Sequence, residues 1–328
     1  MNKHQFIITQ NFRLTPTTIL LTLSLSHPQL QFQFEPGQYV GISYKEHIFP
    51  SPVRCFSIVS TPNPESTLQL GIRLGGAYTH KLASLAPGTQ CTIYGPFGEF
   101  VLPKQNLGPI ILLAGGIGIT PLLSILRSAT KQQLNHPIHL LYSNRSQTDI
   151  PFLPEIKQLA SINPHLHYQI HLSEESAPST LEPNMTLGKI DKTILKELPL
   201  EGHFLICGPP PFMTAMVNTL LDLKVNPERI ITEAFGQQAN PIIPQSDWMP
   251  ALLYWSVATA LVLSTVGVAT ADLNAKASDA TSLPSPSLSP TPLVNPTPTP
   301  SLSPSLKPTA TPSPSPTPQV YYPRSHAS

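Results

Sequence analysis

The chain has 328 residues and a formal net charge of +1 at pH 7. That length allows two domains with residues left over, and a charge so close to zero gives no electrostatic case for a nucleic-acid partner. The three cysteines form no C-x-x-C pair, so the chain cannot hold a four-cysteine iron–sulfur cluster by itself. Their odd number and wide spacing are typical of a reducing compartment.

The first hundred residues predict an all-β domain. The first ten residues contain no apolar core of signal-peptide length, so we expect the front of the chain to stay in the cytosol. Short apolar or alternating segments between Pro- and Gly-rich turns predict strands at 17–25, 34–44, 54–60, 68–74 and 90–95. Several short strands at this spacing favour a closed antiparallel barrel.

One cation in this domain stands out. Arg54 lies in a predicted strand that is otherwise apolar in character. A buried arginine needs an anion, and the planar guanidinium suits a phosphate. The alternative is an internal salt bridge with a carboxylate.

From Leu107 the pattern changes to strands alternating with helices. Apolar runs predict strands at 110–114, 138–143, 166–173 and 203–208. Helices are expected around 121–131, 151–160, 191–197 and 211–223. Such alternation is typical of a doubly wound parallel sheet with helices on both faces.

A glycine-rich turn joins the first of these strands to the first helix. Gly115, Gly116 and Gly118 follow the apolar run 110–113 and lead to Pro121, which suits a helix start. Glycines at this place leave backbone N–H groups and the helix dipole open to an anion, and a dinucleotide pyrophosphate is the usual occupant. The alternative is a tight strand-to-helix turn without a ligand.

Two further strand ends carry polar residues. Ser143 and Arg145 end the second strand, where an arginine can accommodate the 2′-phosphate of NADP and an acid is expected for NAD. The nearest acid is Asp149, so the pattern favours NADPH, with a solvated loop arginine as the alternative. His165, His167 and His171 alternate along the third strand without a further metal ligand, which favours an exposed strand face over a zinc site.

The composition changes sharply near the carboxyl end. Residues 251–271 hold no charged residue, and Trp248, Tyr254 and Trp255 gather at one end, as in a membrane-spanning helix with an interfacial aromatic belt. The following segment is rich in Pro, Ser and Thr, which predicts a disordered, extended spacer. A buried helix and a late signal-like segment with a cleavage site at 269–271 are the alternatives.

Six motifs in fixed order give residues 1–236 a family resemblance. In chain order they are Arg54-Cys55-Phe56-Ser57, Gly76-Ala77-Tyr78-Thr79, Gly95-Pro96-Phe97-Gly98, the glycine turn from Gly115 to Pro121, Cys207-Gly208-Pro209 and Glu233-Ala234-Phe235. The chain thereby resembles the ferredoxin–NADP reductase superfamily. The resemblance implies a Greek-key FAD-binding barrel at 1–104 and a doubly wound NAD(P)-binding domain at 105–236. A linker at 237–250, the transmembrane helix 251–271 and the disordered tail 272–328 complete the expected organisation.

On the flavin side, the resemblance assigns roles to the first two motifs. It implies that Arg54 meets the FAD pyrophosphate, that Phe56 packs on the flavin and that Ser57 lies near the reactive ring nitrogen. Gly76 and Thr79 would add contacts to the same pyrophosphate, with Tyr78 beside them; a plain hairpin turn is the alternative for this second motif.

On the nicotinamide side, the glycine turn would hold the cofactor's pyrophosphate. Its last two residues, Thr120 and Pro121, would lie beside the nicotinamide. Cys207, followed by Gly208 and Pro209, would face the hydride-transfer region, although most buried cysteines are ordinary core residues. The late motif would bring Glu233 to the reaction centre and stack Phe235 on the flavin face; for this phenylalanine the alternative is a residue that closes the last strand.

The resemblance implies a membrane-anchored, FAD-containing NAD(P)H oxidoreductase with its catalytic domains in the cytoplasm. Reducing equivalents would pass from NAD(P)H to FAD and on to a separate acceptor, such as ferredoxin or flavodoxin. A free-flavin or ferric-chelate reductase is one alternative. A membrane-tethered flavin redox sensor without turnover is another.

Overall fold

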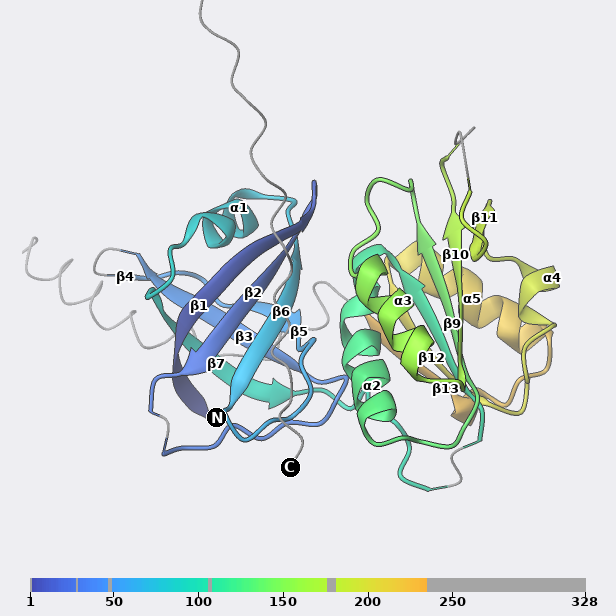
Figure 1. Ribbon diagram of the computed structural model, residues 1–328, viewed down its shortest axis with the longest axis horizontal. Coiled ribbons are helices and arrows are strands. Elements are labelled where there is room, and N and C mark those ends of the chain that lie inside the picture. The colour runs from blue at the N-terminus through green and yellow to red at the C-terminus, as the bar shows by residue number, and fades with distance from the viewer. Residues whose placement is uncertain (1, 28, 47–48, 106–107, 176–180, 235–328) are drawn as a thin grey trace, which may run out of the picture. The chain divides into compact units, whose positions relative to one another are not determined.

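The computed structural model describes residues 2–27, 29–46, 49–105, 108–175 and 181–234, which all belong to one compact unit (Figure 1). Two sheets follow one another along the chain. No helix among these residues is long and apolar enough to cross a membrane. The predicted span 251–271, the Pro-rich tail and Phe235 lie outside the described residues.

The first domain is an antiparallel sheet, as predicted, and it also holds one helix that the sequence did not predict. Its elements are β1 (Lys3–Thr15), β2 (Thr18–Leu25), β3 (Tyr39–Glu46), β4 (Phe49–Pro50), β5 (Arg54–Ser57), β6 (Thr67–Arg73), α1 (Ala77–Ser84) and β7 (Gln90–Phe97). The strands lie in the order β4-β3-β7-β1-β2-β6, and β5 pairs with β3. An antiparallel bridge between Ile58 and Leu70 joins the end of β5 to β6, which closes the sheet on itself.

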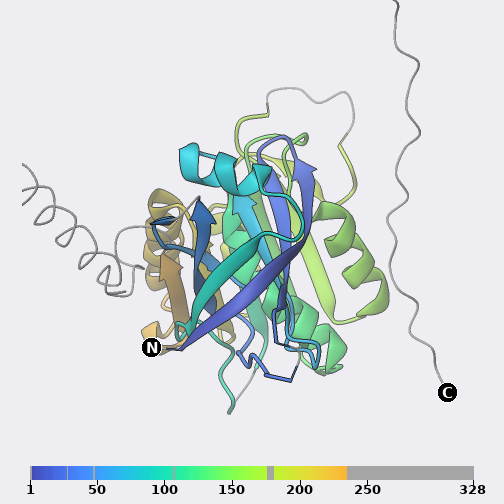
Figure 2. The same ribbon diagram turned by 90° about the vertical axis from the view of Figure 1, so that its left-hand side faces the viewer.

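Alternating residues of these strands fill the interior of the barrel. Leu21, Leu23, Leu68, Leu70 and Ile93 are all fully buried there, because alternate side chains of a strand point to the same face. Helix α1 lies at one end of the barrel (Figures 1 and 2).

The second domain is a six-stranded parallel sheet, again as predicted. Its strands are β8 (Ile110–Gly115), β9 (Ile138–Asn144), β10 (Leu166–Leu172), β11 (Met185–Leu187), β12 (His203–Gly208) and β13 (Ile230–Ala234), in the order β11-β10-β9-β8-β12-β13. The helices are α2 (Ile119–Lys131), α3 (Leu153–Ile162), α4 (Lys192–Leu195) and α5 (Pro210–Asp222), with short 3-10 turns η1 (Gly116–Gly118) and η2 (Pro227–Arg229).

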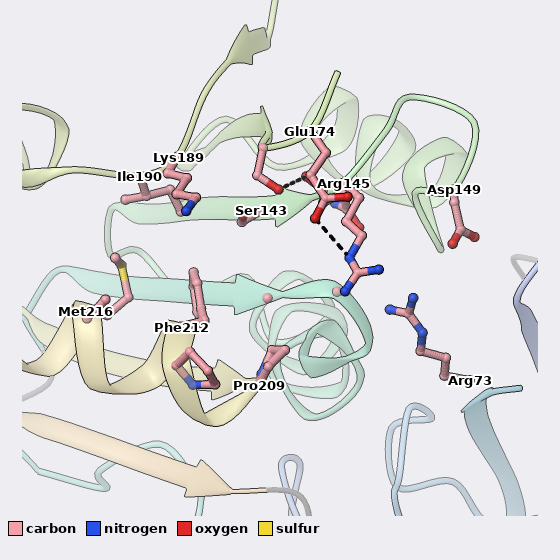
Figure 3. A pocket seen from close by; sticks show the side chains of 16 residues that line it. Arg73, Ser143, Arg145, Asp149, Glu174, Lys189, Ile190, Pro209, Phe212 and Met216 are labelled. Carbon is pink, nitrogen blue, oxygen red and sulfur yellow. Dashed lines mark hydrogen bonds and ion pairs between the residues drawn. The ribbon is translucent and has the colours of Figure 1, made fainter. Parts of the chain in front are cut away.

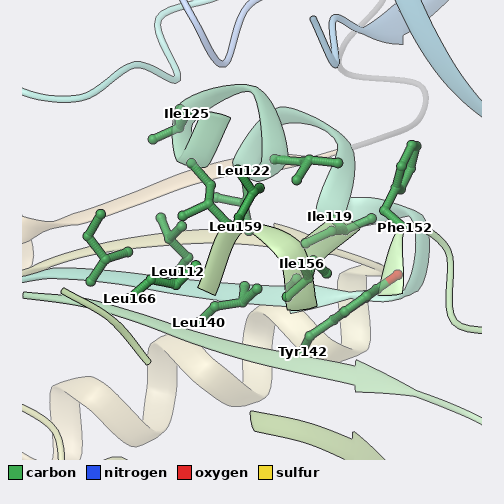
Figure 4. Packing of buried hydrophobic residues seen from close by; sticks show 14 of the residues in the cluster. Leu112, Ile119, Leu122, Ile125, Leu140, Tyr142, Phe152, Ile156, Leu159 and Leu166 are labelled. Atoms are coloured by element: carbon green, nitrogen blue, oxygen red, sulfur yellow. The ribbon is translucent and has the colours of Figure 1, made fainter. Parts of the chain in front are cut away.

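Two separate cores cover the two faces of this sheet. Leu112, Leu140 and Tyr142 point to the face that α2 and α3 cover (Figure 4). Ile111 and Leu113 point to the opposite face, where α4 and α5 pack. Every residue of β8 is buried, which explains why its sequence is a continuous apolar run and not an alternation.

Helix α2 also contacts the barrel. Arg127 donates through Nη1 to the carbonyl oxygen of Val59 at 3.0 Å and to Oε1 of Gln69 at 2.8 Å. Its Nη2 donates to Oε2 of Glu155 at 2.8 Å, so α3 holds the guanidinium in place. Ser124, one turn earlier, donates to the carbonyl oxygen of Ser60 at 2.7 Å. These bonds fix α2 against the segment that follows β5.

Candidate functional site

The first two motifs meet at the amino end of α1. The Thr79 hydroxyl accepts hydrogen bonds from the backbone N–H groups of Gly75 at 3.0 Å and Gly76 at 3.3 Å, which caps the helix start. A Cβ added to either glycine would touch nothing within 4 Å. The second motif is therefore an open helix start, and the alternative of a plain hairpin turn is wrong.

Arg54 lies beside this helix start but is exposed, so the expectation that it is buried is wrong. Its Cζ lies 5.8 Å from the centre of the Tyr78 ring, and Nη1 donates to the Val53 carbonyl oxygen at 3.2 Å. Within the described parts of the chain Arg54 forms no ion pair, which does not favour an internal salt bridge. Arg54 is the first residue of β5 and its side chain is exposed, so its guanidinium is accessible to a phosphate.

An aromatic group lies next to Arg54. Phe56 stacks on Tyr78 with ring centres 6.5 Å apart and an interplanar angle of 18°. The Tyr78 hydroxyl donates to the carbonyl oxygen of Ile42 at 2.8 Å, and burial raises the pKa of this phenol. Tyr78 is therefore a fixed, neutral ring that supports Phe56 and Arg54.

A polar centre joins β5 to the end of β13. Ser57 is buried, and its Oγ donates to Oε2 of Glu233 at 3.5 Å. A Cβ built on Gly98 would stand 3.3 Å from the other carboxylate oxygen of Glu233, Oε1. The same Cβ position lies 3.0 Å from the Tyr39 ring, so Gly98, Tyr39 and Glu233 are neighbours. Burial, Cys55 and Glu233 all raise the pKa of Tyr39, in that order. We call Tyr39, Ser57, Cys207 and Glu233 the polar centre.

The charge of Glu233 depends on pH near neutrality. Burial raises the pKa of its carboxyl to about 7, although the hydrogen bond from Ser57 acts in the opposite direction. Cys207 lies on the neighbouring strand, opposite Glu233 in register, and is fully buried. Burial and then the nearby Glu233 raise the pKa of its thiol, so Cys207 is a neutral side chain here.

The three glycines of the turn after β8 serve different purposes. A Cβ on Gly118 would stand 2.1 Å from the carbonyl oxygen of Cys207, so the close approach of β12 requires glycine there. A Cβ on Gly115 would stand 2.9 Å from the Phe212 ring. Gly116 has φ +54° and lines a pocket. Packing thus accounts for two of the glycines, and Gly116 is the one best placed to present its backbone to a ligand.

Thr120 and Pro121 are buried in the first turn of α2. The Thr120 hydroxyl donates to the carbonyl oxygen of Ile117 at 2.9 Å. Its methyl group lies next to Gly71 of β6, where a Cβ would stand only 2.6 Å away. The start of α2 therefore rests against the barrel wall, close to the strand that ends at Arg73.

A pocket of about 380 Å³ lies at the carboxyl ends of β8, β9 and β10 and is called the strand-end pocket below (Figure 3). Gly115, Gly116, Ser143 and Pro209 line it, as does an apolar wall that includes Phe212. This is where parallel α/β sheets bind ligands. Gly208 lies just outside this lining, where its Cβ would stand 2.8 Å from the Phe212 ring.

Five charged side chains line the strand-end pocket: Arg73, Arg145, Asp149, Glu174 and Lys189. Figure 3 shows the guanidinium of Arg73, which comes from the barrel, turned toward that of Arg145. Nε of Arg145 lies 3.3 Å from Oε1 of Glu174. Asp149 accepts a 2.6 Å hydrogen bond from the Thr17 hydroxyl, and its pKa is lowered by the hydroxyl groups of Thr15 and Thr17 and by Arg73, against an opposing effect of burial.

The three histidines of the predicted third strand do not share one environment: His167 and His171 lie in β10, and His165 precedes it. His167 is exposed and stacks on His139 at 5.4 Å, whereas His171 is 1% exposed, so the predicted exposed face is wrong for His171. No group of three or more metal-ligating side chains occurs among the described residues.

Sequence reasoning missed four residues that the fold brings to these sites. Tyr39, Arg73, Glu174 and Lys189 belong to no motif of the sequence. The available signal was a position at a strand boundary, where ligands of such folds often bind. Tyr39 follows a Pro-Gly turn at the start of β3, and Glu174 follows the end of β10. Phe235, the remaining predicted site residue, lies outside the described residues.

The donor sets fit the two expected cofactors. An open helix start beside an exposed arginine suits a pyrophosphate, and the aromatic group of Phe56 and Tyr78 suits a flat ring. Two guanidinium groups and the half-buried Gly116 line the strand-end pocket, which suits a second phosphorylated ligand.

Comparisons with known proteins agree with these assignments. A family model for the oxidoreductase FAD-binding domain matches residues 5–102, and one for the oxidoreductase NAD-binding domain matches residues 112–218. The ferredoxin–NAD(P)(+) reductase component of the naphthalene 1,2-dioxygenase system of Pseudomonas putida is 30% identical over 220 residues. The match covers 66% of this chain and 63% of that relative, so the chain spans less than two thirds of the relative's length.

Solved structures show the same fold. The cytochrome P450 reductase of Amycolatopsis matches with a TM-score of 0.62 and 26% identity, over 71% of this chain and 70% of that one. A ferredoxin NADP+ reductase from Neisseria gonorrhoeae, with bound FAD and NADP, matches with a TM-score of 0.61 and 20% identity, over 71% of this chain and 99% of that one. With an FAD-binding domain followed by an NAD-binding domain on this fold, the chain belongs to the ferredoxin reductase superfamily.

Proposed function

We propose that the chain is an FAD-dependent NAD(P)H oxidoreductase that passes electrons to a separate, ferredoxin-like acceptor. The observation that carries this proposal is the polar centre, where Ser57 of the barrel meets Glu233 of the parallel sheet at 3.5 Å. It lies between the expected flavin side and the expected nicotinamide side. Relatives include reductase components of dioxygenase and monooxygenase systems.

When bound, the nicotinamide and the flavin would supply the redox chemistry, in which reducing equivalents pass from NAD(P)H toward a separate acceptor. The chain's own residues position the reactants and manage protons. The buried Ser57 hydroxyl can donate a hydrogen bond to a ring nitrogen or to Glu233. Because the pKa of Glu233 is about 7, its carboxyl can hold or release a proton at neutral pH.

Anaerobic titration of the yellow, purified protein with NADPH and with NADH tests the proposal. We expect at least one of them to bleach the flavin absorbance within the mixing time of a stopped-flow instrument. Protein that retains its flavin but is bleached by neither nicotinamide would contradict the enzyme and support the tethered flavin sensor.

The flavin cradle at the start of α1 has its own test in Gly76→Ala. Gly76 has φ −178°, an extended conformation that any residue adopts, and its Cβ would touch nothing. The substitution is therefore expected to change the unfolding free energy of the flavin-free chain by less than about 0.5 kcal/mol relative to the parent protein. A pyrophosphate at this place would meet the new methyl group, so flavin retention after gel filtration should fall at least tenfold.

Arg54→Ala should weaken flavin retention too, because it removes the charge expected to pair with the pyrophosphate. Full flavin occupancy in both variants would place the pyrophosphate elsewhere.

The acceptor is tested by comparing reduction rates for a ferredoxin, a flavodoxin, free FMN and a ferric chelate. A kcat/KM for ferredoxin or flavodoxin that exceeds the kcat/KM for free FMN and for the ferric chelate by more than a hundredfold supports the electron-transfer role. Equal rates with free FMN or ferric chelate would favour the alternative of a free-flavin or ferric-chelate reductase.

We further propose that residues 251–271 anchor the protein in a membrane and that residues 1–249 remain in the cytoplasm. Support comes from the sequence alone, because the segment is uncharged and has aromatic residues at one end. Carbonate extraction should leave the full-length protein in the membrane pellet. Release into the supernatant would contradict the anchor, and a shorter mature protein by mass spectrometry would favour the cleaved-segment alternative.

A further inference from the structure

The charge of the side chains that line the strand-end pocket is nearly balanced. Three cations and two carboxylates line the pocket, and Asp149 is already engaged by the Thr17 hydroxyl at 2.6 Å. Glu174 is the remaining carboxylate, and its Oε1 lies 3.3 Å from Nε of Arg145. Arg145 is the cation that the sequence assigns to a 2′-phosphate, so its partner bears directly on which cofactor can bind.

The backbone fixes Glu174 beside Arg145. The N–H of Glu174 donates to the carbonyl oxygen of Arg145 at 3.0 Å. One residue earlier, the N–H of Ser173 donates to the carbonyl oxygen of Asn144 at 2.8 Å, and the Ser173 hydroxyl donates to the same oxygen at 3.2 Å. The segment after β10 is therefore tied to the segment after β9, which holds the Glu174 backbone beside Arg145 and keeps its carboxylate within one side-chain length of the guanidinium.

The ion pair itself is weak and open to solvent. The side chains of Arg145 and Glu174 are 71% and 63% exposed, and such pairs contribute little to stability. An incoming phosphate can therefore separate the pair, but the tethered carboxylate stays nearby and repels it. A ribose 2′-hydroxyl meets no such repulsion, because a carboxylate accepts a hydrogen bond from a hydroxyl group.

We propose that Glu174 is the specificity-determining residue of the strand-end pocket and selects dinucleotides with a free 2′-hydroxyl over those with a 2′-phosphate. The proposal rests on the proposed function, since it assumes that the pocket binds a nicotinamide dinucleotide. It assigns Arg145 as the cation whose charge Glu174 offsets. It also revises the expectation from the sequence, because Arg145 alone favours NADPH whereas the pair favours NADH.

The test uses two nucleotides that differ only in the 2′-phosphate, 2′,5′-ADP and 5′-AMP, in calorimetric titrations of the full-length, flavin-loaded protein. Glu174→Gln should tighten binding of 2′,5′-ADP by roughly tenfold and change binding of 5′-AMP by less than about twofold. Adding Arg145→Gln should abolish that gain. Glu182→Gln is the matched control, because Glu182 forms an ion pair with Lys157 and does not line the pocket. Equal thermal midpoints for the two glutamine variants verify folding.

The outcomes separate this proposal from the proposed function. A ratio of the two affinities that Glu174→Gln leaves unchanged overturns the role of Glu174, whether or not the flavin is reduced. Wild-type protein that binds neither nucleotide overturns the pocket assignment and this proposal with it. The predicted shift in affinities, found in a protein whose flavin no nicotinamide reduces, supports Glu174 and contradicts the oxidoreductase. In an active enzyme, kcat/KM for NADPH relative to NADH should rise by the same roughly tenfold factor.

Discussion

Arg73 ends β6 of the barrel, yet its guanidinium lines a pocket of the parallel-sheet domain (Figure 3). Its Nη1 lies 3.4 Å from the point where a Cβ on Gly116 would stand, which places the charge at the glycine turn. Arg73 is thus positioned for the pyrophosphate that NADH and NADPH share.

We therefore expect Arg73→Gln to raise KM for NADH and NADPH by the same factor, about tenfold, because one charge-assisted hydrogen bond is lost. Steady-state kinetics with each cofactor measure the effect. Arg229→Gln, which changes a partly exposed arginine outside the pocket lining, should leave both KM values unchanged. A loss confined to NADPH would mean that Arg73 reads the 2′-phosphate instead.

Glu233 couples the pH to the stability of the fold. Its pKa is raised from 4.5 to about 7, so the folded chain binds more protons than the unfolded chain between these values. The unfolding free energy contributed by this group must therefore fall as pH rises from about 4.5 to 7, and the full penalty is present above pH 7.

Glu233→Gln should remove this dependence. Relative to the parent, the variant should become more stable between pH 5 and pH 8, because glutamine has no charge to bury. Urea unfolding of both flavin-free proteins at the two pH values provides the measurement. Stability curves that stay parallel over this range would show that the Glu233 carboxyl titrates normally.

At the scale of elements, the contact between the turn after β8 and the end of β12 tolerates no side chain. Gly118→Ala would place a methyl group 2.1 Å from the Cys207 carbonyl oxygen and 2.7 Å from the Gly208 nitrogen, both backbone atoms. We expect the unfolding free energy to fall by about 2 kcal/mol or more, since the turn and β12 must move apart. Gly108→Ala is the control, because its Cβ would touch nothing within 4 Å. Equal unfolding free energies for the two variants would contradict the contact.

Most elements could be predicted from the sequence, because their patterns are local. The alternation in β2 and the continuous apolar run in β8 each determine how many faces of the strand are buried. β1 was missed because its 13 residues are mostly polar and its register shifts twice against β2. α1, β11 and β13 were also missed, since they are short and depend on tertiary contacts.

The site was predictable where neighbours in sequence act together, and not where the fold joins distant residues. Phe56, Ser57, Tyr78 and Thr79 lie within two motifs, and these motifs meet at one helix start. Arg54 lies beside that helix start, but its predicted burial was wrong, because β5 exposes its first residue to solvent. The pairing of Arg145 with Glu174 needs β9 and β10 to be neighbours, which no local pattern in the sequence encodes.

At the scale of the whole molecule, Arg127 links α2 to the barrel through side-chain hydrogen bonds. It bonds to Val59, Gln69 and Glu155, and the side chains of the arginine and the glutamate are only 17% and 21% exposed. Helix α2 begins directly after the glycine turn, so the position of this helix would determine where a bound nicotinamide lies relative to a bound flavin.

Arg127→Gln should lower the unfolding free energy by about 2–3 kcal/mol, because Glu155 keeps a largely buried, unpaired charge. It should also lower kcat more than it raises KM, since reacting atoms displaced by about 1 Å lose rate. Lys104→Gln breaks an exposed pair with Glu35 and should cost less than about 1 kcal/mol. Equal losses of unfolding free energy for the two variants in urea, or an unchanged kcat for Arg127→Gln, would contradict the role of Arg127 in positioning α2.

The Ser57–Glu233 contact spans 176 positions of the chain, and this separation sets an order of events during biosynthesis. All strands of the barrel lie within residues 3–97, so the barrel and the flavin cradle can form while the second domain is still being synthesised. At roughly 5–20 residues per second, Glu233 emerges about ten seconds later. The nascent protein therefore passes through a stage that can take up flavin but lacks the carboxylate. During that stage Val59 and Phe100, which α2 later covers, stand exposed to water and to chaperones.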